Sequence, residues 1–358
     1  GGTGNWGDGT HWSLTSGGAA ANCVPTKIDN VYFDGNSFAG GAKIVTINVD
    51  TSCRSMDWTG INTANTRTLN GTTNRNLSIW GSLTFNANAN MVNNFQGTIY
   101  FKSDSTGRTI DLKGKTLNGN NTYFDGAGDW TFVSAFNSKT LNHQKGTIKT
   151  NNNFLSLINY SSTSANTRGL ELGSTSAALT GNWNISDSAN YSMNSGTSII
   201  FMDGSFFNGG GLTYNNITLT NPTQVSIMNG NTYNDFSVST AKIIGFEGGK
   251  MHTFSTLTIP DGTSCSDLVN LGTLTAGVAA AFSMASGIYN GDFLQITDIT
   301  ASGGATFSAT NSYGIGDVTG WNITSPAADD FYWVGGTGNW SDSTHWSLTS
   351  GGTPGTCI

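Results

Sequence analysis

Charged residues are scarce in this chain of 358 residues: Lys, Arg, Asp and Glu together make up 10%, against roughly 25% in ordinary soluble domains. Fifteen cationic residues against 22 acidic ones leave a net charge of −7, and no run of Lys or Arg occurs. The sequence therefore offers no electrostatic footprint for nucleic acid or for an anionic membrane. No apolar stretch approaches the roughly 18 residues of a membrane-spanning helix, so we expect no membrane insertion.

Proline and cysteine are also rare, with five and four residues, whereas glycine numbers 48. A chain with so many small and polar residues would be disordered if it also had few hydrophobic residues. Its 36% hydrophobic and 11% aromatic content is too high for that. We expect a surface made of neutral amides and hydroxyls, which suits stacked β-coils better than a packed α/β core.

The strongest feature that is present is an internal repeat. Gly1–Gly18 reads GGTGNWGDGTHWSLTSGG and Gly335–Gly352 reads GGTGNWSDSTHWSLTSGG, so that sixteen of eighteen positions agree at an offset of 334. Cys23 matches Cys357 at the same offset, and the second copy is preceded by residues 331–334 (FYWV), which have no counterpart before the first. A tandem array of 334-residue periods explains this pattern.

The repeat divides the chain into three predicted parts. Residues 1–28 form a capping or junction motif, the truncated start of a repeat. Residues 29–325 form the body of the period, and residues 326–358 form a linker and the start of the next repeat.

A finer period lies within the body. The pattern [K/R]-T-L-N occurs at residues 67–70, 115–118 and 139–142. Its phase places six asparagines at 24-residue intervals: Asn70, Asn94, Asn118, Asn142, Asn166 and Asn190. Around them run short alternating apolar segments separated by Gly, Asn and Asp, without an amphipathic helix. This pattern predicts an all-β, right-handed parallel β-helix (a β-solenoid) of about 24 residues per coil and about twelve coils. Its handedness follows only from the prevalence of that fold. The six asparagines would stack as a buried turn ladder.

The cysteines allow a disulfide bridge. Cys23 precedes the expected strand at residues 30–33 and Cys53 follows the next one, so a Cys23–Cys53 bridge would staple the first coil by about 3 kcal/mol. Such a bridge would indicate an oxidising, extracellular setting. The alternative is a pair of buried free thiols, and we favour the bridge. No spacing of Cys and His indicates zinc, and the sequence assigns no partner to Cys265.

The junction motif resembles repeats of large, repetitive, secreted surface adhesins of Bacteroidota, the type IX-secreted proteins that include gliding-motility fibres. The residues that carry the resemblance cover about a sixth of the chain: Gly1–Gly18, Cys23, Pro25, Thr26, Asp29–Asp34 and Tyr332–Cys357. The resemblance implies display and adhesion at the cell surface, and it brings no catalytic residues with it.

The motif also holds the most conspicuous aromatic cluster. Its members are Trp6, His11 and Trp12 in the first copy, and Trp333, Trp340, His345 and Trp346 in the second. Exposed tryptophans could stack on sugar rings. The interpretation we favour is a cap, because an uncapped solenoid end exposes core and unpaired backbone.

Candidates for chemistry are few. Asp8 with His11, and Asp342 with His345, supply only two ligands each, and we favour a hydrogen-bonded polar pair over a metal site. We predict neither metal nor cofactor. Parallel β-helices also host polysaccharide lyases and hydrolases, whose chemistry needs paired carboxylates. Asp104 and Asp129 lie nearly in register on adjacent expected coils and are the candidate catalytic pair. Solvated turn carboxylates explain the two residues equally well. We expect the chain to have no enzymatic activity.

These observations favour a structural and adhesive repeat module of a long extracellular surface fibre, acting as a stiff spacer and attachment scaffold. Its expected partners are neighbouring repeats of the same chain and, beyond them, surface polysaccharide or other fibre chains. The alternative is a phage tail-fibre or tailspike β-helix that binds or degrades polysaccharide.

Overall fold

The structure is a computed structural model that describes residues 2–265, 267–326 and 330–355. It is all-β, and its parallel strands stack as a β-solenoid of about 13 turns that follow one another roughly every 22 residues. In the described ranges, the helical elements are two single-turn 3-10 helices, η1 (Gly9–His11) and η2 (Ser343–His345). The predicted fold class is confirmed. No helix of the described part has the length and apolar character needed to cross a membrane.

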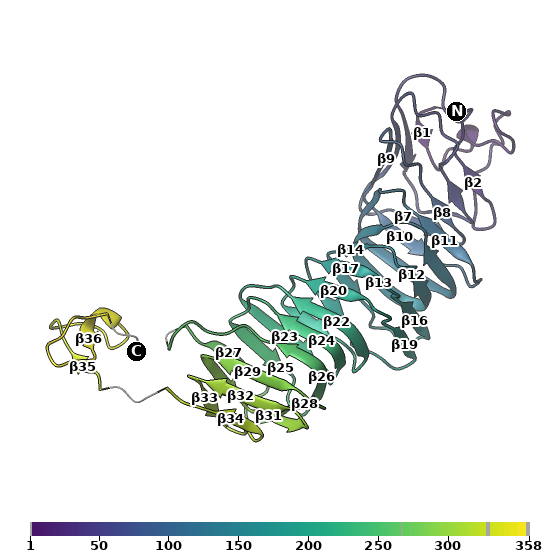
Figure 1. Ribbon diagram of the computed structural model, residues 1–358. Coiled ribbons are helices and arrows are strands. Elements are labelled where there is room, and N and C mark those ends of the chain that lie inside the picture. Colours follow the sequence, from purple (N-terminus) through teal and green to yellow (C-terminus); the bar gives the residue numbers. More distant parts are fainter. Residues whose placement is uncertain (1, 266, 327–329, 356–358) are drawn as a thin grey trace. The chain divides into compact units, whose positions relative to one another are not determined.

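The chain divides into two compact units, within which the strands are stacked one on another (Figure 1). The first unit comprises Gly1–Gly204 and Asn208–Asn216, and the second comprises Ser205–Phe207 and Ile217–Ile358. The boundary between them falls inside the predicted body at residues 29–325.

The strands of the first unit are β1 (Gly4–Asn5), β2 (Val31–Tyr32), β3 (Lys43–Ile47), β4 (Thr51–Cys53), β5 (Met56–Asp57), β6 (Arg67–Gly71), β7 (Asn76–Ile79), β8 (Leu83–Thr84), β9 (Met91–Phe95), β10 (Thr98–Phe101), β11 (Arg108–Asp111), β12 (Thr116–Phe132), β13 (Phe136–Lys149), β14 (Leu155–Leu157), β15 (Asn159–Ser161), β16 (Arg168–Glu171), β17 (Ser176–Leu179), β18 (Trp183–Asn184), β19 (Tyr191–Asn194) and β20 (Ile199–Met202). Two further strands contain residues of both units, namely β21 (Phe206–Asn208) and β22 (Thr213–Leu219).

The strands of the second unit are β23 (Gln224–Met228), β24 (Thr232–Val238), β25 (Ile243–Phe246), β26 (Met251–Thr258), β27 (Val269–Thr273), β28 (Ala280–Met284), β29 (Ile288–Asp292), β30 (Leu294–Thr297), β31 (Ile299–Gly303), β32 (Thr306–Thr310), β33 (Tyr313–Ile315), β34 (Trp321–Ile323), β35 (Tyr332–Trp333) and β36 (Trp346–Ser347).

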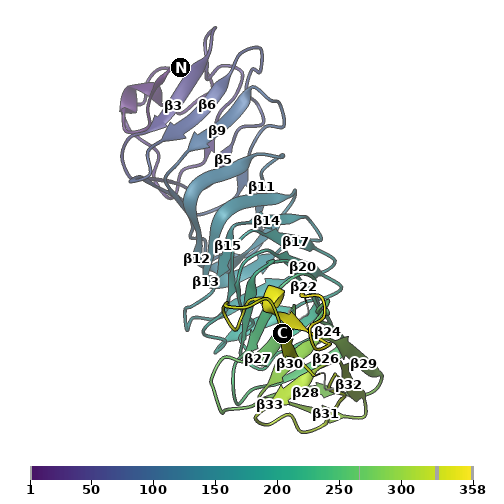
Figure 2. The ribbon, with the colours of Figure 1, turned by 90° about the vertical axis from the view of Figure 1, so that its left-hand side faces the viewer.

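Early coils of the first unit contain three short strands each, and each strand pairs in parallel with its counterpart one coil away. One face is the sheet β1-β3-β6-β9, whose last three strands lie side by side in Figure 2. A second face begins with β4, β7 and β10, and a third with β2, β5, β8 and β11. The 17-residue strand β12 pairs with both β10 and β11, so that it follows two faces without a break.

The predicted coil length holds only for part of the chain. Lys43 pairs with Arg67, which is the predicted spacing. In the second unit, the coil between the paired residues Gln224 and Ile243 is shorter, whereas the coil from Met251 to its partner Ala281 is longer. The paired strands stay in register while the loops between them differ in length. A strict sequence period therefore cannot persist, and the average falls to roughly 22.

Alternation along each strand builds the core. In β6 the side chains of Arg67 and Leu69 are buried, while those of Thr68 and Asn70, which alternate with them, are half-exposed. Glycine is required where coils approach most closely. A Cβ added to Gly119 would collide with the carbonyl oxygen of Gly97 on the preceding coil. Inward apolar side chains and close-packed backbone thus hold the coils together.

Candidate functional site

The two copies of the aromatic motif adopt the same local structure. In the first copy, the Asp8 carboxylate caps η1 by accepting hydrogen bonds from Thr10 N at 3.0 Å and Thr10 Oγ1 at 2.7 Å. These bonds, from the hydroxyl first and the amide next, lower the pKa of the Asp8 carboxyl. Trp12 Nε1 donates to the Trp6 carbonyl oxygen at 2.8 Å, and the two indoles meet edge to face at 4.8 Å.

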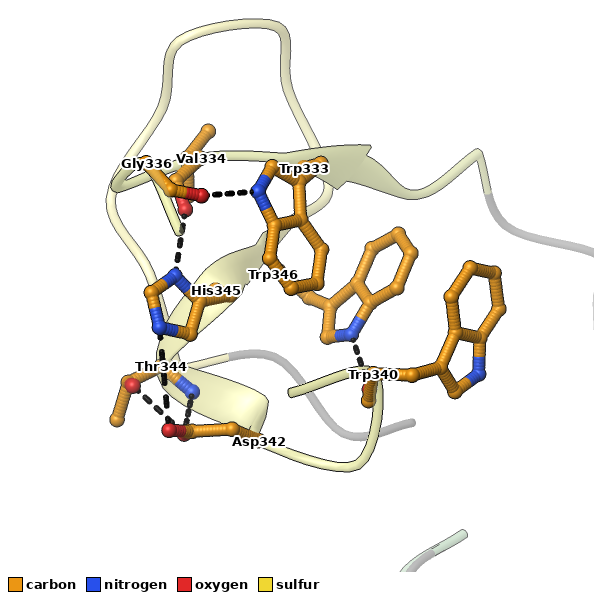
Figure 3. Close-up of polar contacts among 8 residues, drawn as sticks. All are labelled: Trp333, Val334, Gly336, Trp340, Asp342, Thr344, His345 and Trp346. Carbon is orange, nitrogen blue, oxygen red and sulfur yellow. Dashed lines mark hydrogen bonds and ion pairs between the residues drawn. The ribbon is translucent and has the colours of Figure 1, made fainter. Parts of the chain in front are cut away.

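The second copy repeats each of these contacts (Figure 3). Asp342 accepts from Thr344 N at 3.0 Å and from Thr344 Oγ1 at 2.6 Å, which likewise lowers the pKa of its carboxyl. Trp346 Nε1 donates to the Trp340 carbonyl oxygen at 2.8 Å, with ring centroids 4.6 Å apart. The Asp-x-Thr-His-Trp segment and the Trp that precedes it therefore form a unit that carries its own hydrogen bonds.

The first copy lies against the start of the solenoid. Its strand β1 continues the β3 ladder, with Gly4 opposite Val45, and Trp6 N donates to the Thr46 carbonyl oxygen at 2.7 Å. The Asn48 Oδ1 accepts a hydrogen bond from Gly7 N at 3.0 Å. Trp6 is only 1% exposed as a result.

Aromatic rings connect this copy to the core of the first coils. Trp12 lies 6.0 Å from Phe33, which stacks on Trp58 at 3.8 Å. Phe38 also stacks on Phe33, and the guanidinium of buried Arg67 lies over the Phe38 ring. The motif thus covers the apolar end of the stack, as a cap must.

The second copy has a different environment. Its own preceding strand β35 pairs antiparallel with β36, and Trp333 stacks on His345 at 4.9 Å. His345 Nδ1 donates to the Val334 carbonyl oxygen at 3.1 Å. Trp346 is buried, but Trp340 is 73% exposed, although it corresponds to Trp6. The first indole of the motif, which the first copy buries, is therefore exposed in the second.

The structure places the seven predicted aromatic and imidazole residues in two groups. Trp6 and Trp12 come together, with exposed His11 beside Asp8 at 3.7 Å. Each of these Asp–His pairs stands without a third ligand, since the described residues contain no group of three His, Cys, Asp or Glu side chains that could hold a metal ion.

The six asparagines do not form the predicted buried ladder. All six are half-buried or exposed. Asn70 and Asn94 are in register, and the amide of Asn94 lies 3.4 Å from Asn70 Oδ1. Beyond them the coil shortens, so each later amide donates to another group: Asn118 to Asn93 O, Asn142 to Asn121 Oδ1, Asn166 to Gln144 O and Asn190 to Ala165 O. The asparagines cross-link adjacent coils from outside rather than filling the core.

The predicted Cys23–Cys53 bridge is wrong, because both residues carry free thiols. Cys23 lies on an exposed loop, whereas Cys53 occupies an inward position of β4 opposite Ile79. Burial raises the pKa of the Cys53 thiol to about 12. Cys53 therefore serves as a small apolar core residue.

Asp104 and Asp129 are both engaged in structural hydrogen bonds. Asp104 accepts from Ala127 N at 2.7 Å. Asp129 accepts from Gly107 N and pairs with Lys149 Nζ at 2.7 Å. Partial burial would raise the pKa of Asp129, but the bonds from Lys149 and Gly107 outweigh it and the pKa is lowered. A carboxylate held ionised in this way suits an inter-coil clamp better than a general acid.

Two features escaped the sequence analysis, and the first is a buried polar network. His143 Nε2 donates to the Gly146 carbonyl oxygen at 2.9 Å, so its Nδ1 accepts from Tyr160, whose hydroxyl accepts in turn from Tyr191 at 2.6 Å. Desolvation lowers the pKa of His143 to about 4 and keeps it neutral. Beside it, Arg168 is 1% exposed and donates to Ser162 and to backbone carbonyls. The sequence held one signal for this network: Arg168 occupies a position of its strand that alternation predicts to be buried.

The second feature is a surface groove over three early coils. It is lined by Lys27, Ile28, Arg54, Trp80, Ser103, Asp104, Ser105 and Arg108. These residues are widely separated in the sequence, and only the stacking of coils brings them together.

Comparison with known protein families, with curated proteins and with solved structures finds no match to this chain. The fold and the geometry of its own residues therefore carry the functional argument.

Proposed function

We propose that the chain is a structural and adhesive repeat module of a long extracellular surface fibre, in which each aromatic motif caps the solenoid that follows it. One observation carries the proposal. The two motif copies share the same internal hydrogen bonds, but their first indole is 1% exposed as Trp6 and 73% exposed as Trp340. A preformed cap with an open docking face is the expected state of a junction that awaits the next period.

The rest of the chain supports a mechanical role. Parallel ladders join each coil to its neighbours, and outward amides and ion pairs such as Lys149–Asp129 add side-chain links between coils. Few charges and many neutral polar side chains mean that most of the surface is hydrated through amides and hydroxyls. In this proposal the fibre acts as a spacer, its partners are its own neighbouring periods, and adhesion takes place on its outer faces.

Hydroxyl-radical footprinting of a two-period chain tests the junction. Residues 1–352 followed directly by residues 19–358 keep the offset of 334. Trp340 should be oxidised rapidly in the single-period chain and protected in the two-period chain, while Trp6 stays protected in both. The terminal copy of the motif in the longer chain provides an internal exposed control. Equal oxidation of Trp340 in both chains would contradict the proposal.

A separate assay addresses polysaccharide cleavage. The chain should leave the molar mass of a panel of surface polysaccharides unchanged, as followed by light scattering. A fall in mass that is abolished by Asp104→Asn or Asp129→Asn would replace the structural role with an enzymatic one.

A further inference from the structure

The groove over the early coils is built by successive corners of the solenoid. Arg54 lies between β4 and β5, Trp80 between β7 and β8, and Ser103 between β10 and β11. Cys53 and Ile79, which directly precede the first two, are in register, and Trp80 N donates to the Cys53 carbonyl oxygen at 3.0 Å. Because coils are about 4.8 Å apart, the corners extend over about 10 Å. The groove has a volume of about 420 Å³ and is largely open to solvent.

The loop that closes one side is itself held in place. Asp29 Oδ2 accepts hydrogen bonds from Thr26 N at 2.9 Å and Thr26 Oγ1 at 2.6 Å. The carbonyl oxygen of Asp29 accepts from Arg54 N at 2.7 Å. These bonds fix Lys27 beside the corner, where its ammonium lies 5.1 Å from the centre of the Trp80 ring. The groove is therefore a built surface rather than a gap between free loops.

Three cations face this groove without an anionic partner. Within the described part of the chain, Lys27, Arg54 and Arg108 form no ion pair with a carboxylate, whereas lysines elsewhere, such as Lys149, do. Asp104 also lines the groove, but it is bound to Ala127 N. Three positive charges against one negative charge give a local excess that opposes the net charge of −7.

The guanidinium of Arg108 is oriented for a ligand. Its Nε donates to Ser103 Oγ at 3.2 Å, and Ser103 is only 3% exposed. Among the described residues, neither terminal nitrogen of Arg108 donates to a protein group. This arrangement leaves terminal nitrogens that can bind a carboxylate or sulfate with paired hydrogen bonds.

Trp80 supplies the other half of the recognition surface. Its indole is partly exposed, and the contact with Lys27 is of the exposed cation–π kind. Such contacts are worth only about 0.5–1 kcal/mol. An incoming ligand can therefore displace the ammonium from the ring and pair it with an anionic group. An indole face beside guanidinium groups suits a ring with apolar C–H groups and a carboxylate or sulfate.

We propose that this groove binds an acidic glycan, with Trp80 stacking on a sugar ring and Arg54, Arg108 and Lys27 pairing with its carboxylates or sulfates. The inference rests on the proposed adhesive function and names its ligand class. A nucleic acid is disfavoured, because nucleic-acid affinity is typically built from about 6–10 phosphate contacts and the groove offers three cations. The span of about 10 Å, two coil spacings, suits a short run of sugar rings.

Isothermal titration calorimetry on the full chain tests the site with oligogalacturonate, hyaluronate oligosaccharides and chondroitin sulfate as probes. At least one should bind, and sodium chloride should weaken the binding. Arg54→Gln combined with Arg108→Gln should weaken it at least tenfold, and Trp80→Ala likewise, while Trp80→Phe should retain most of it. The matched control is Lys250→Gln, which removes an exposed charge outside the groove and should change affinity less than twofold. Circular dichroism verifies that each variant is folded.

Several results would overturn the inference. One is an absence of binding to all three acidic probes, and another is equal binding to neutral dextran. Equally tight binding of polyglutamate or single-stranded DNA would indicate a general polyanion surface instead. Acidic-glycan binding that survives in the Arg54/Arg108 double variant would place the site elsewhere. None of these outcomes changes the oxidation of Trp340 in the two-period chain, so failure of the groove and failure of the junction can be told apart.

Discussion

Substituting one tryptophan in two chain contexts gives the sharpest test of the junction. Trp6 is 1% exposed and Trp340 is 73% exposed, a difference of 72 percentage points (73 − 1). An aromatic side chain buries about 150–250 Å² in a core. Docking of Trp340 in the manner of Trp6 therefore removes about 110–180 Å² from water. At about 25 cal/mol/Å², this contributes about 3–4.5 kcal/mol.

The single-period chain calibrates the measurement. Trp6→Ala should lower the free energy of unfolding by about 3–5 kcal/mol, the usual cost of removing a buried Trp. Trp340→Ala should change it by less than about 0.5 kcal/mol, because the side chain is exposed. The buried Trp6 Nε1 has no hydrogen-bond partner in the described residues. Trp6→Phe loses no hydrogen bond and keeps most of the aromatic area. It should therefore lower the free energy of unfolding far less than Trp6→Ala.

In the two-period chain, Trp340→Ala should behave as Trp6→Ala does. We expect a loss of about 3 kcal/mol that is confined to the first coils of the second period, since coils of a solenoid stabilise their neighbours. Hydrogen-exchange mass spectrometry across a urea series resolves the two periods. A neutral effect of Trp340→Ala there, alongside a large effect of Trp6→Ala, would refute the docking argument. A large effect in the single-period chain would show that the indole is already buried.

Three further predictions follow from the core. Iodoacetamide should modify Cys23 in the native chain and Cys53 only after unfolding, as read by peptide mapping; a peptide cross-linked through both would contradict the free thiols. Desolvation lowers the pKa of His252 to about 3, and neither ring nitrogen has a partner in the described part of the chain. Its folded pKa lies below the ordinary 6.5, so its contribution is complete above pH 6.5 and is lost as the pH falls toward 3. Lowering the pH from 7 to 4 should therefore destabilise the wild type by about 3 kcal/mol more than His252→Phe, at about 1.4 kcal/mol per pKa unit. Gly119→Ala should lower the unfolding midpoint in urea markedly, because its Cβ meets the Gly97 carbonyl oxygen; an unchanged midpoint would mean that the coils can separate there.

The fold was predictable because alternation and turn residues are local signals. Strands such as β6 and β10 bury every second side chain, as their sequences indicate. The coil length was predicted less well. The spacing of 24, taken from the repeated pattern at residues 67–70, 115–118 and 139–142, matches the pairing of Lys43 with Arg67 but fails where loops shorten or lengthen. The 24-residue spacing of the asparagines continues in the sequence beyond the coils whose strands pair at that spacing. Only Asn70 and Asn94 could be paired correctly from spacing alone.

The sites depended on information that spacing does not contain. The capping interpretation needed the burial of Trp6, which a sequence cannot supply. The cysteine prediction failed because Cys53 occupies a buried, inward position of its strand. The prediction had relied instead on Cys23 and Cys53 flanking successive strands. The groove could not be predicted, because the corner that holds Trp80 is defined only once the coils are in register.

The ladder between coils also determines how the chain would respond to a pull along its length. Within the first compact unit, a strand such as β6 pairs with β3 on one side and with β9 on the other, so each coil is held by the coils next to it. A coil of roughly 22 residues occupies about 4.8 Å in the stack and about 70–80 Å when drawn out. Force would thus free coils in succession from one end. Single-molecule traces should advance in steps of about 70 Å, the drawn-out length of one coil less its rise in the stack. Such steps would make the module an extensible tether that absorbs load before it gives way.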